Sequence, residues 1–242
     1  MMLLLLAAGL IGGIVNALAG GATLITFPAM LAAGLPPVIA NASNAVAVAP
    51  GHLIAALVDR GQLPAPDRRL VLAMVVAAVG GAAGGALLLA LPDHLFLLPV
   101  PALIGGSTLL FAVGPWLQAR AGRWRGGRLL PLGLASIYGG FFGAGLGIIL
   151  TMVLSLDPQA GIRAVKALKN LLATCVSLAA IVLFVARGAV AWPETLVMLA
   201  GALAGGYAGG HLIRVLPARL VRVGVIAVGT VLSVVYALRI WF

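Results

Sequence analysis

Long apolar segments, separated by short clusters of charged residues, proline and glycine, make up most of this chain. There are eight of them, at 2–33, 38–58, 70–91, 95–118, 129–156, 164–186, 192–213 and 219–241. Most are about 20–25 residues long, enough for a helix to cross the ~30 Å hydrocarbon core of a bilayer. Only 8% of the residues are charged, whereas a soluble domain carries about 25%. The sequence therefore predicts an all-α protein that crosses a membrane several times.

The positive charge of the chain is divided among the loops rather than gathered on one face. The net charge is +10, but the basic residues form short clusters between apolar segments. Membrane proteins carry their cytoplasmic charge in this way. We therefore expect the lipid bilayer as a partner and no nucleic acid. The single cysteine, Cys175, excludes an internal disulfide and a cysteine-based metal site.

The N-terminus has some features of a secretory signal peptide. Residues 1–10 are apolar, and Ala17-Leu18-Ala19 resembles a cleavage site. No basic region precedes the apolar stretch, as a signal peptide would require. The same segment also has a counterpart in the middle of the chain. We therefore expect it to remain in the mature protein.

Two of the apolar segments are too long for one crossing and too short for two. As straight helices, 2–33 would be about 48 Å long and 129–156 about 42 Å long. Each has glycines near its middle, namely Gly20 and Gly21 in the first and Gly143, Gly145 and Gly147 in the second. We predict that each segment is a pair of short helices meeting at a glycine turn, either re-entrant or barely spanning. Such irregular backbone is tolerated at membrane depth only where protein or a water-filled cavity satisfies it.

The two halves of the chain repeat each other. Residues 81–92 read GAAGGALLLALP, and residues 206–217, 125 positions later, read GYAGGHLIRVLP, with seven of twelve identical. Two further matching pairs are Arg60-Gly61 with Arg187-Gly188, and Asn44 with Asn170. We divide the chain into a first repeat at 1–118, a basic linker at 119–128 and a second repeat at 129–242. Each repeat is predicted to be one glycine-broken hairpin followed by three transmembrane helices.

The distribution of charge predicts that the two repeats are inverted. The linker carries Arg120, Arg123, Arg125 and Arg128, so we place it inside the cell. If each repeat makes a net odd number of crossings, the basic clusters within 59–69, 157–169 and 214–222 are also inside. That arrangement puts 13 of the 15 basic residues inside and leaves only Arg187 and Arg239 outside. The prediction is a multi-pass protein of a bacterial-type inner (plasma) membrane with both termini outside.

The sequence lacks the motifs of common enzymes. There is no Walker motif, no His-Glu-x-x-His, no Gly-x-Ser-x-Gly and no Cys-x-x-Cys. The five acidic residues lie at predicted helix ends or in loops, whereas cation sites usually need buried carboxylates. We therefore predict no enzyme activity, no cofactor and no metal. Inverted repeats with broken helices are instead common in secondary transporters, whose sites lie near the broken segments.

The glycine turns favour an anion as the ligand. Short helices starting after Gly21 and Gly147 would direct unpaired N–H groups and positive dipole ends toward the centre of the membrane. Helix N-termini of this kind bind anions, and Asn16 and Thr23 would add donors. The alternative is that glycines only allow close helix packing. We prefer that alternative for Gly81, Gly84 and Gly85 and for their counterparts Gly206, Gly209 and Gly210.

Polar residues form a stripe on one predicted helix in each half. In the second half the stripe consists of Arg163, Lys166, Asn170, Thr174 and Ser177, spaced three or four residues apart, with Lys169 beside it. In the first half, Asn41, Asn44 and His52 share a face, with Ser43 beside it. We predict substrate-binding roles for the asparagines, Ser43, Lys166 and Lys169. The alternatives are snorkelling for the cations near the helix start and hydrogen-bonded packing for His52, which as a site residue would link transport to protons.

These residues resemble the TauE/SafE sulfite exporter family, also called TSUP. The resemblance is carried by AGLIGGIVNALAGGATLITFPAMLAAGLPPVIANASNAVAVAPGHLIAALVDRG in the first half, and by GGFFGAGLGIILTMVLSL and ALKNLLATCVSLAAIVLFVARG in the second. It implies a fold like the one predicted above and transport of small sulfur-containing or organic anions such as sulfite, thiosulfate, sulfoacetate or sulfolactate. Many members carry a lysine directly after the asparagine that matches Asn44, but this chain has Ala45. Lys166 or Lys169 would then supply the positive charge.

The sequence thus predicts a secondary transporter, an exporter of small anions that works by alternating access. With the cell interior negative, outward movement of one negative charge gains about 2.3 kcal/mol per 100 mV. Two alternatives stay open, namely an anion channel of the same fold and a membrane scaffold that transports nothing. Proton coupling and assembly as a homodimer are further hypotheses that the sequence leaves open.

Overall fold

The computed structural model describes residues 1–18, 20–121, 127–156, 161–212 and 218–242, and its regular elements there are helices. Arg123, Arg125 and Arg214, which the topology prediction used, lie outside the described residues. The helices are α1 (Met2–Leu18), α2 (Thr23–Ala32), α3 (Pro37–Val58), η1 (Arg60–Gln62), α4 (Arg68–Ala90), α5 (Asp93–Leu97), α6 (Val100–Ala121), α7 (Leu129–Phe141), α8 (Leu146–Leu154), α9 (Ile162–Ala186), α10 (Trp192–Leu212) and α11 (Ala218–Ile240).

Several helices have the length and composition of membrane spans. Within the described residues, five stretches are long and apolar enough to cross a bilayer: Pro37–Val58, Arg68–Ala90, Asp93–Leu117, Ile162–Ala186 and Leu220–Ile240. Shorter apolar helices are Met2–Leu18, Thr23–Ala32 and Leu129–Phe141. The prediction of an all-α, multi-pass membrane protein is therefore confirmed.

Both overlong segments break at their glycines, as predicted. In the first, α1 ends at Leu18 and α2 begins at Thr23, with Gly20 and Gly21 between them at φ angles of 71° and 104°. In the second, Gly143 and Gly145 lie between α7 and α8 at φ angles of 78° and 77°. Residues other than glycine rarely adopt these φ angles. The chain therefore turns where the glycines allow it to turn.

One detail of the second turn differs from the prediction. Helix α8 begins at Leu146, so Gly147 lies in its first turn and not ahead of it. Gly145 takes the left-handed conformation at the N-cap position, which completes the turn two residues earlier than expected. Gly147 is thus a helical glycine, and its role must be explained by what surrounds it.

Close helix packing explains some of the repeated glycines but not all of them. A Cβ at Gly81 or Gly84 would clash with the backbone of α9 or α7, and one at Gly209 would press on α1. At Gly85 the approach is less tight, since a Cβ would lie 3.1 Å from Ala180 of α9. These positions agree with the packing interpretation. At Gly206 and Gly210, a Cβ would meet no described atom within 4 Å, so close packing does not account for them.

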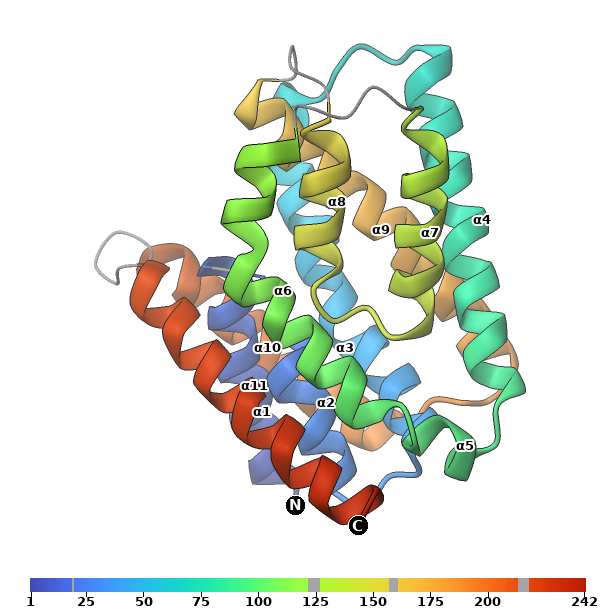
Figure 1. Ribbon diagram of the computed structural model, residues 1–242, viewed down its shortest axis with the longest axis vertical. Helices are drawn as coiled ribbons and strands as arrows, with labels where there is room; N and C mark the ends of the chain where they lie inside the picture. Colours follow the sequence, from blue (N-terminus) through green and yellow to red (C-terminus); the bar gives the residue numbers. More distant parts are fainter. Residues whose placement is uncertain (19, 122–126, 157–160, 213–217) are drawn as a thin grey trace.

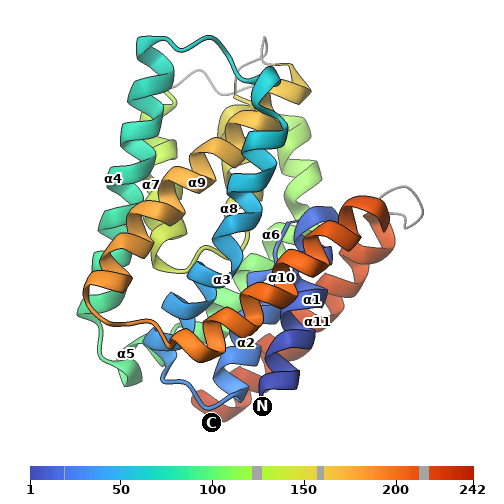
Figure 2. The same ribbon diagram turned by 180° about the vertical axis from the view of Figure 1, so that it is seen from behind.

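The two hairpins approach the middle of the molecule from opposite ends. The N- and C-termini lie together at one end, and α1 rises from that end toward the first turn (Figure 1). Helix α7 descends from the other end to the second turn, and α8 returns from there (Figure 1). Helices α3 and α9 pack against each other (Figure 2). The polar stripes that the sequence predicted lie on these two helices.

Candidate functional site

The first glycine turn is held by residues of α2 and α3. The hydroxyl of Thr26 lies within hydrogen-bond distance of both the Ala22 carbonyl and Oδ1 of Asn44. The Asn44 amide donates to the Thr23 hydroxyl over 3.5 Å. Thr23 and Asn44 are both buried. Because Asn44 lies on α3, these contacts fix the beginning of α2 against a membrane-spanning helix.

The second glycine turn combines an unpaired backbone N–H with a nearby cation. The Leu146 and Ile148 N–H groups donate to the Gly143 and Gly145 carbonyls over 3.1 and 2.9 Å. Within the described residues, the N–H of Gly147 has no backbone acceptor. A Cβ built on Gly147 would lie 3.7 Å from Cδ and 3.9 Å from Nζ of Lys169. The ammonium group of Lys169 therefore lies beside the N-terminus of α8.

The predicted polar residues of α3 reach different parts of the molecule. The Asn41 amide donates to the Phe141 carbonyl at the end of α7 over 2.8 Å. Its Oδ1 is buried and has no partner among the described residues. The Ser43 hydroxyl accepts from the Ala191 N–H over 2.9 Å, at the start of α10 and away from both turns. Helix α3 thus contacts both hairpins, through Asn44 for the first and Asn41 for the second.

Asn16 of α1 packs on α3 at the residue before His52. A Cβ built on Gly51 would be 3.0 Å from Nδ2 of Asn16, so the amide packs on the glycine next to His52. His52 is half-buried. The structure therefore places Asn16 beside Gly51, with His52 one residue further along α3.

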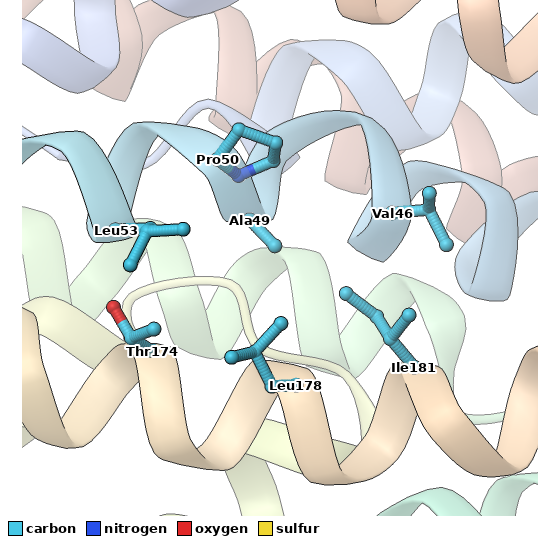
Figure 3. A pocket seen from close by; sticks show the side chains of 7 residues that line it. All are labelled: Val46, Ala49, Pro50, Leu53, Thr174, Leu178 and Ile181. Carbon is cyan, nitrogen blue, oxygen red and sulfur yellow. The ribbon is translucent and has the colours of Figure 1, made fainter.

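Two hollows lie along the contact between α3 and α9. The first, about 440 Å³ in volume, is lined by Asp59, Gln62, Arg163 and Lys166 at the basic end of the molecule. The second is smaller, about 190 Å³, and mostly apolar (Figure 3). Its lining residues are Val46, Ala49, Pro50 and Leu53 of α3, and Thr174, Leu178 and Ile181 of α9.

The predicted stripe on α9 connects these two hollows. Arg163 and Lys166 line the first, and Thr174 lines the second. Lys169 and Asn170 lie between them along the helix, half-buried and buried respectively. Lys166 is exposed. Of the two lysines that the sequence proposed as cations for the substrate, only Lys169 lies next to a glycine turn.

Three residues at the turns were not predicted from the sequence. The Tyr138 hydroxyl donates to the Ala144 carbonyl over 2.7 Å, and the Ser107 hydroxyl lies 2.8 Å from that of Tyr138. The Phe111 ring covers Gly21 so closely that a Cβ there would clash with it. Ser107 and Thr108 are adjacent hydroxyls in an apolar span, a signal that could have identified this part of α6.

The comparisons with known proteins agree with this architecture. A family model described as "Sulfite exporter TauE/SafE" matches residues 5–236. A "Probable membrane transporter protein" of Haemophilus influenzae is 28% identical over 223 residues, which cover 90% of this chain and 88% of that protein. The "Probable membrane transporter protein YfcA" of Escherichia coli is 27% identical over 230 residues, covering 93% and 85%.

No solved structure matches this chain significantly. The family assignment therefore rests on the sequence match, and the helical, glycine-broken architecture agrees with it. The chain belongs to the TauE/SafE family, a family of membrane transporters.

Proposed function

We propose that this protein is a secondary transporter that exports small sulfur-containing or organic anions by alternating access. The observation that carries the proposal is the second glycine turn, where the N-terminus of α8 and the ammonium of Lys169 face the same space. A free backbone N–H and a cation at a helix N-terminus suit a small oxyanion. The names of the relatives support transport, and the family description supports sulfite as a representative substrate.

In this proposal the two turns and the asparagines have distinct roles. Gly147, directly after the Gly143–Gly145 turn, offers its backbone N–H to the anion, and Lys169 offers its charge. Asn170 follows Lys169 into the buried part of α9 and supplies an amide. Gly20, Gly21, Thr23 and Asn44 form the corresponding region of the first repeat. Arg163 and Lys166 draw anions into the hollow at the basic end.

The helix contacts support two corresponding repeats. Suppose that α1, α2, α3, α4 and α6 correspond, in this order, to α7, α8, α9, α10 and α11. Each main contact between two helices then has a counterpart between the two corresponding helices. Helix α1 packs on α10 as α7 packs on α4, and α2 meets α11 as α8 meets α6. Helices α3 and α9 contact each other as the central pair. Rocking between two such halves is the usual basis of alternating access.

In the proposed orientation, with the termini outside, the basic end of the molecule receives the anion for export. The hollow lined by Arg163 and Lys166 then faces the cytoplasm, where the anion binds. The membrane potential favours outward movement of each negative charge by about 2.3 kcal/mol per 100 mV. Proton linkage through His52 and a homodimeric assembly remain part of the hypothesis.

The site is tested by Lys169→Ala and Asn170→Ala in proteoliposomes loaded with labelled sulfite, thiosulfate or a small sulfonate. We expect flux to fall by about tenfold or more in each, because a hydrogen bond to a charged group contributes about 1.5–3 kcal/mol. The matched control is Arg187→Ala, which removes an exposed cation at the other end of α9. Wild-type flux in both site variants, with normal thermal unfolding, would rule out this site.

A further inference from the structure

One segment of α6 contacts both glycine turns. The Ser107 hydroxyl lies 3.1 Å from the Ala144 carbonyl in the second turn. One helical turn later, the ring of Phe111 covers Gly21 in the first turn. Phe111 is almost completely buried. The position of the segment Ser107–Phe111 therefore determines how both turns are packed.

This segment ends just before a proline that leaves a carbonyl without its donor. Pro115 lies inside α6, and a proline has no N–H for the carbonyl four residues earlier. That carbonyl belongs to Phe111. Proline also bends a helix and weakens the ladder around it. Directly before the proline, Gly114 lies close to Ile148 of α8, and α6 rises beside α8 (Figure 1).

The missing donor is replaced by an arginine of α11. Nε of Arg222 donates to the Phe111 carbonyl over 2.8 Å, and Nη2 donates to the Ala112 carbonyl over 2.7 Å. The normal donor of the Ala112 carbonyl is the N–H of residue 116, directly after the proline. The planar fork of a guanidinium can reach two neighbouring carbonyls, whereas a lysine ammonium acts as a point charge. Arg222 therefore closes the gap that Pro115 opens.

Side chains of α11, and of Trp241 directly after it, fasten the first part of α6 and the residues just before it. Ser233 donates to the Pro101 carbonyl and the Trp241 indole to the Leu98 carbonyl, each over 2.9 Å. Gly229 lies so close to Thr108 that a Cβ there would clash. The part of α6 before Pro115 is thus attached to α11, and Arg222 makes the last attachment before the bend.

We propose that Arg222 is a positioning residue for transport. By replacing the donor that Pro115 lacks, it holds the segment Ser107–Phe111 across both glycine turns. The sequence pattern had assigned Arg222 only to the cytoplasmic excess of positive charge, a role that any cation would serve. The structural role needs the two donors of the guanidinium, and it exists because Pro115 lacks an N–H. Its consequence for flux rests on the proposed transport function, but its effect on the turns does not.

The test is a double-mutant cycle of Arg222→Gln, Arg222→Lys and Pro115→Ala. It uses the purified full chain with Cys175→Ala, and Ala22→Cys as a reporter in the first turn, where Ala22 is buried. In Arg222→Gln, we expect N-ethylmaleimide to label residue 22 about fivefold faster or more. The thermal unfolding midpoint should fall by about 4–8 °C. Arg222→Lys should resemble Arg222→Gln, because it keeps the charge but loses the fork.

Pro115→Ala provides the decisive comparison, because it returns an N–H to the Phe111 carbonyl. In this background, Arg222→Gln should change labelling and midpoint by less than half as much as it does in the wild type. The proposal is overturned if the effects of Arg222→Gln and Pro115→Ala on labelling and midpoint are additive. It is also overturned if residue 22 is labelled at the wild-type rate in Arg222→Lys. If Arg222→Gln does not fold, Arg222→Lys with and without Pro115→Ala carries the same comparison. Labelling and unfolding need no substrate. If Pro115→Ala reduces the effect of Arg222→Gln on both, but the protein shows no anion flux, the proposed function is rejected and the positioning role of Arg222 stands.

Discussion

Gly21 and Gly147 illustrate two different reasons for a glycine in a transporter. Gly21 has a φ angle of 104°, and the Phe111 ring occupies the space that a side chain would need. Gly147 is helical, and a methyl group there would make only ordinary contacts with Lys169. A substitution at Gly21 therefore disturbs the fold, whereas one at Gly147 disturbs the space beside a cation.

At Gly147, substitution by alanine is expected to separate stability from function. Alanine is favoured over glycine inside a helix by about 1 kcal/mol, so the unfolding midpoint of Gly147→Ala should stay the same or rise. Anion flux should fall by about fivefold, because the methyl group fills the space between the α8 N-terminus and Lys169. Proteoliposome flux and thermal unfolding measure the two effects.

The matched control for that substitution is Gly106→Ala in α6, where a Cβ meets no described atom within 4 Å. It should leave flux unchanged. If Gly147→Ala also transports at the wild-type rate, the anion does not approach the N-terminus of α8 as we propose.

At the scale of elements, the second hairpin is held by hydroxyls at its turn. Tyr138 of α7 and Ser107 of α6 converge on the Ala144 carbonyl. The buried Ala144 carbonyl needs such partners because it lies in a loop, where no helix N–H satisfies it. The first hairpin relies instead on Thr26 and Asn44. The two turns are therefore similar in backbone but are stabilised by different side chains.

Removing the tyrosine hydroxyl should loosen the second turn. Tyr138→Phe deletes a donor to the Ala144 carbonyl, and we expect a loss of about 1 kcal/mol. That loss lowers the unfolding midpoint by about 2–4 °C. Tyr207→Phe is the control, since its ring is 75% exposed on α10. An equal midpoint for the two variants would show that the hydroxyl of Tyr138 does not hold the turn.

The elements differ in how far the sequence could predict them. The breaks at Gly20–Gly21 and Gly143–Gly145 were predictable, because a helix too long for the membrane and a glycine's freedom of φ are local properties. The contacts of Arg222 with Phe111 were not, because they join residues 111 positions apart. No periodicity within either helix encodes such a pair. For the same reason the sequence proposed both Lys166 and Lys169, and only the packing of α8 on α9 distinguishes them.

At the scale of the whole molecule, the fold brings two hairpins from opposite ends toward one pair of crossing helices. Helix α3 contacts both hairpins through Asn44 and Asn41, and α9 places Lys169 beside the second. Helix α6 touches both turns, and α11 holds α6 in place. A movement of one half relative to the other would therefore change both turns together. Such coupling is what alternating access requires.

Counterflow in proteoliposomes tests the proposed carrier mechanism most directly. Purified protein is reconstituted, vesicles are preloaded with unlabelled sulfite, thiosulfate or a small sulfonate, and entry of the labelled anion is followed. The account predicts that the preloaded anion accelerates entry, because a carrier returns faster when it is loaded. Entry at the same rate with and without preloading would indicate a channel. No entry above that of protein-free vesicles for any of these anions would contradict the proposed transport of small sulfur anions.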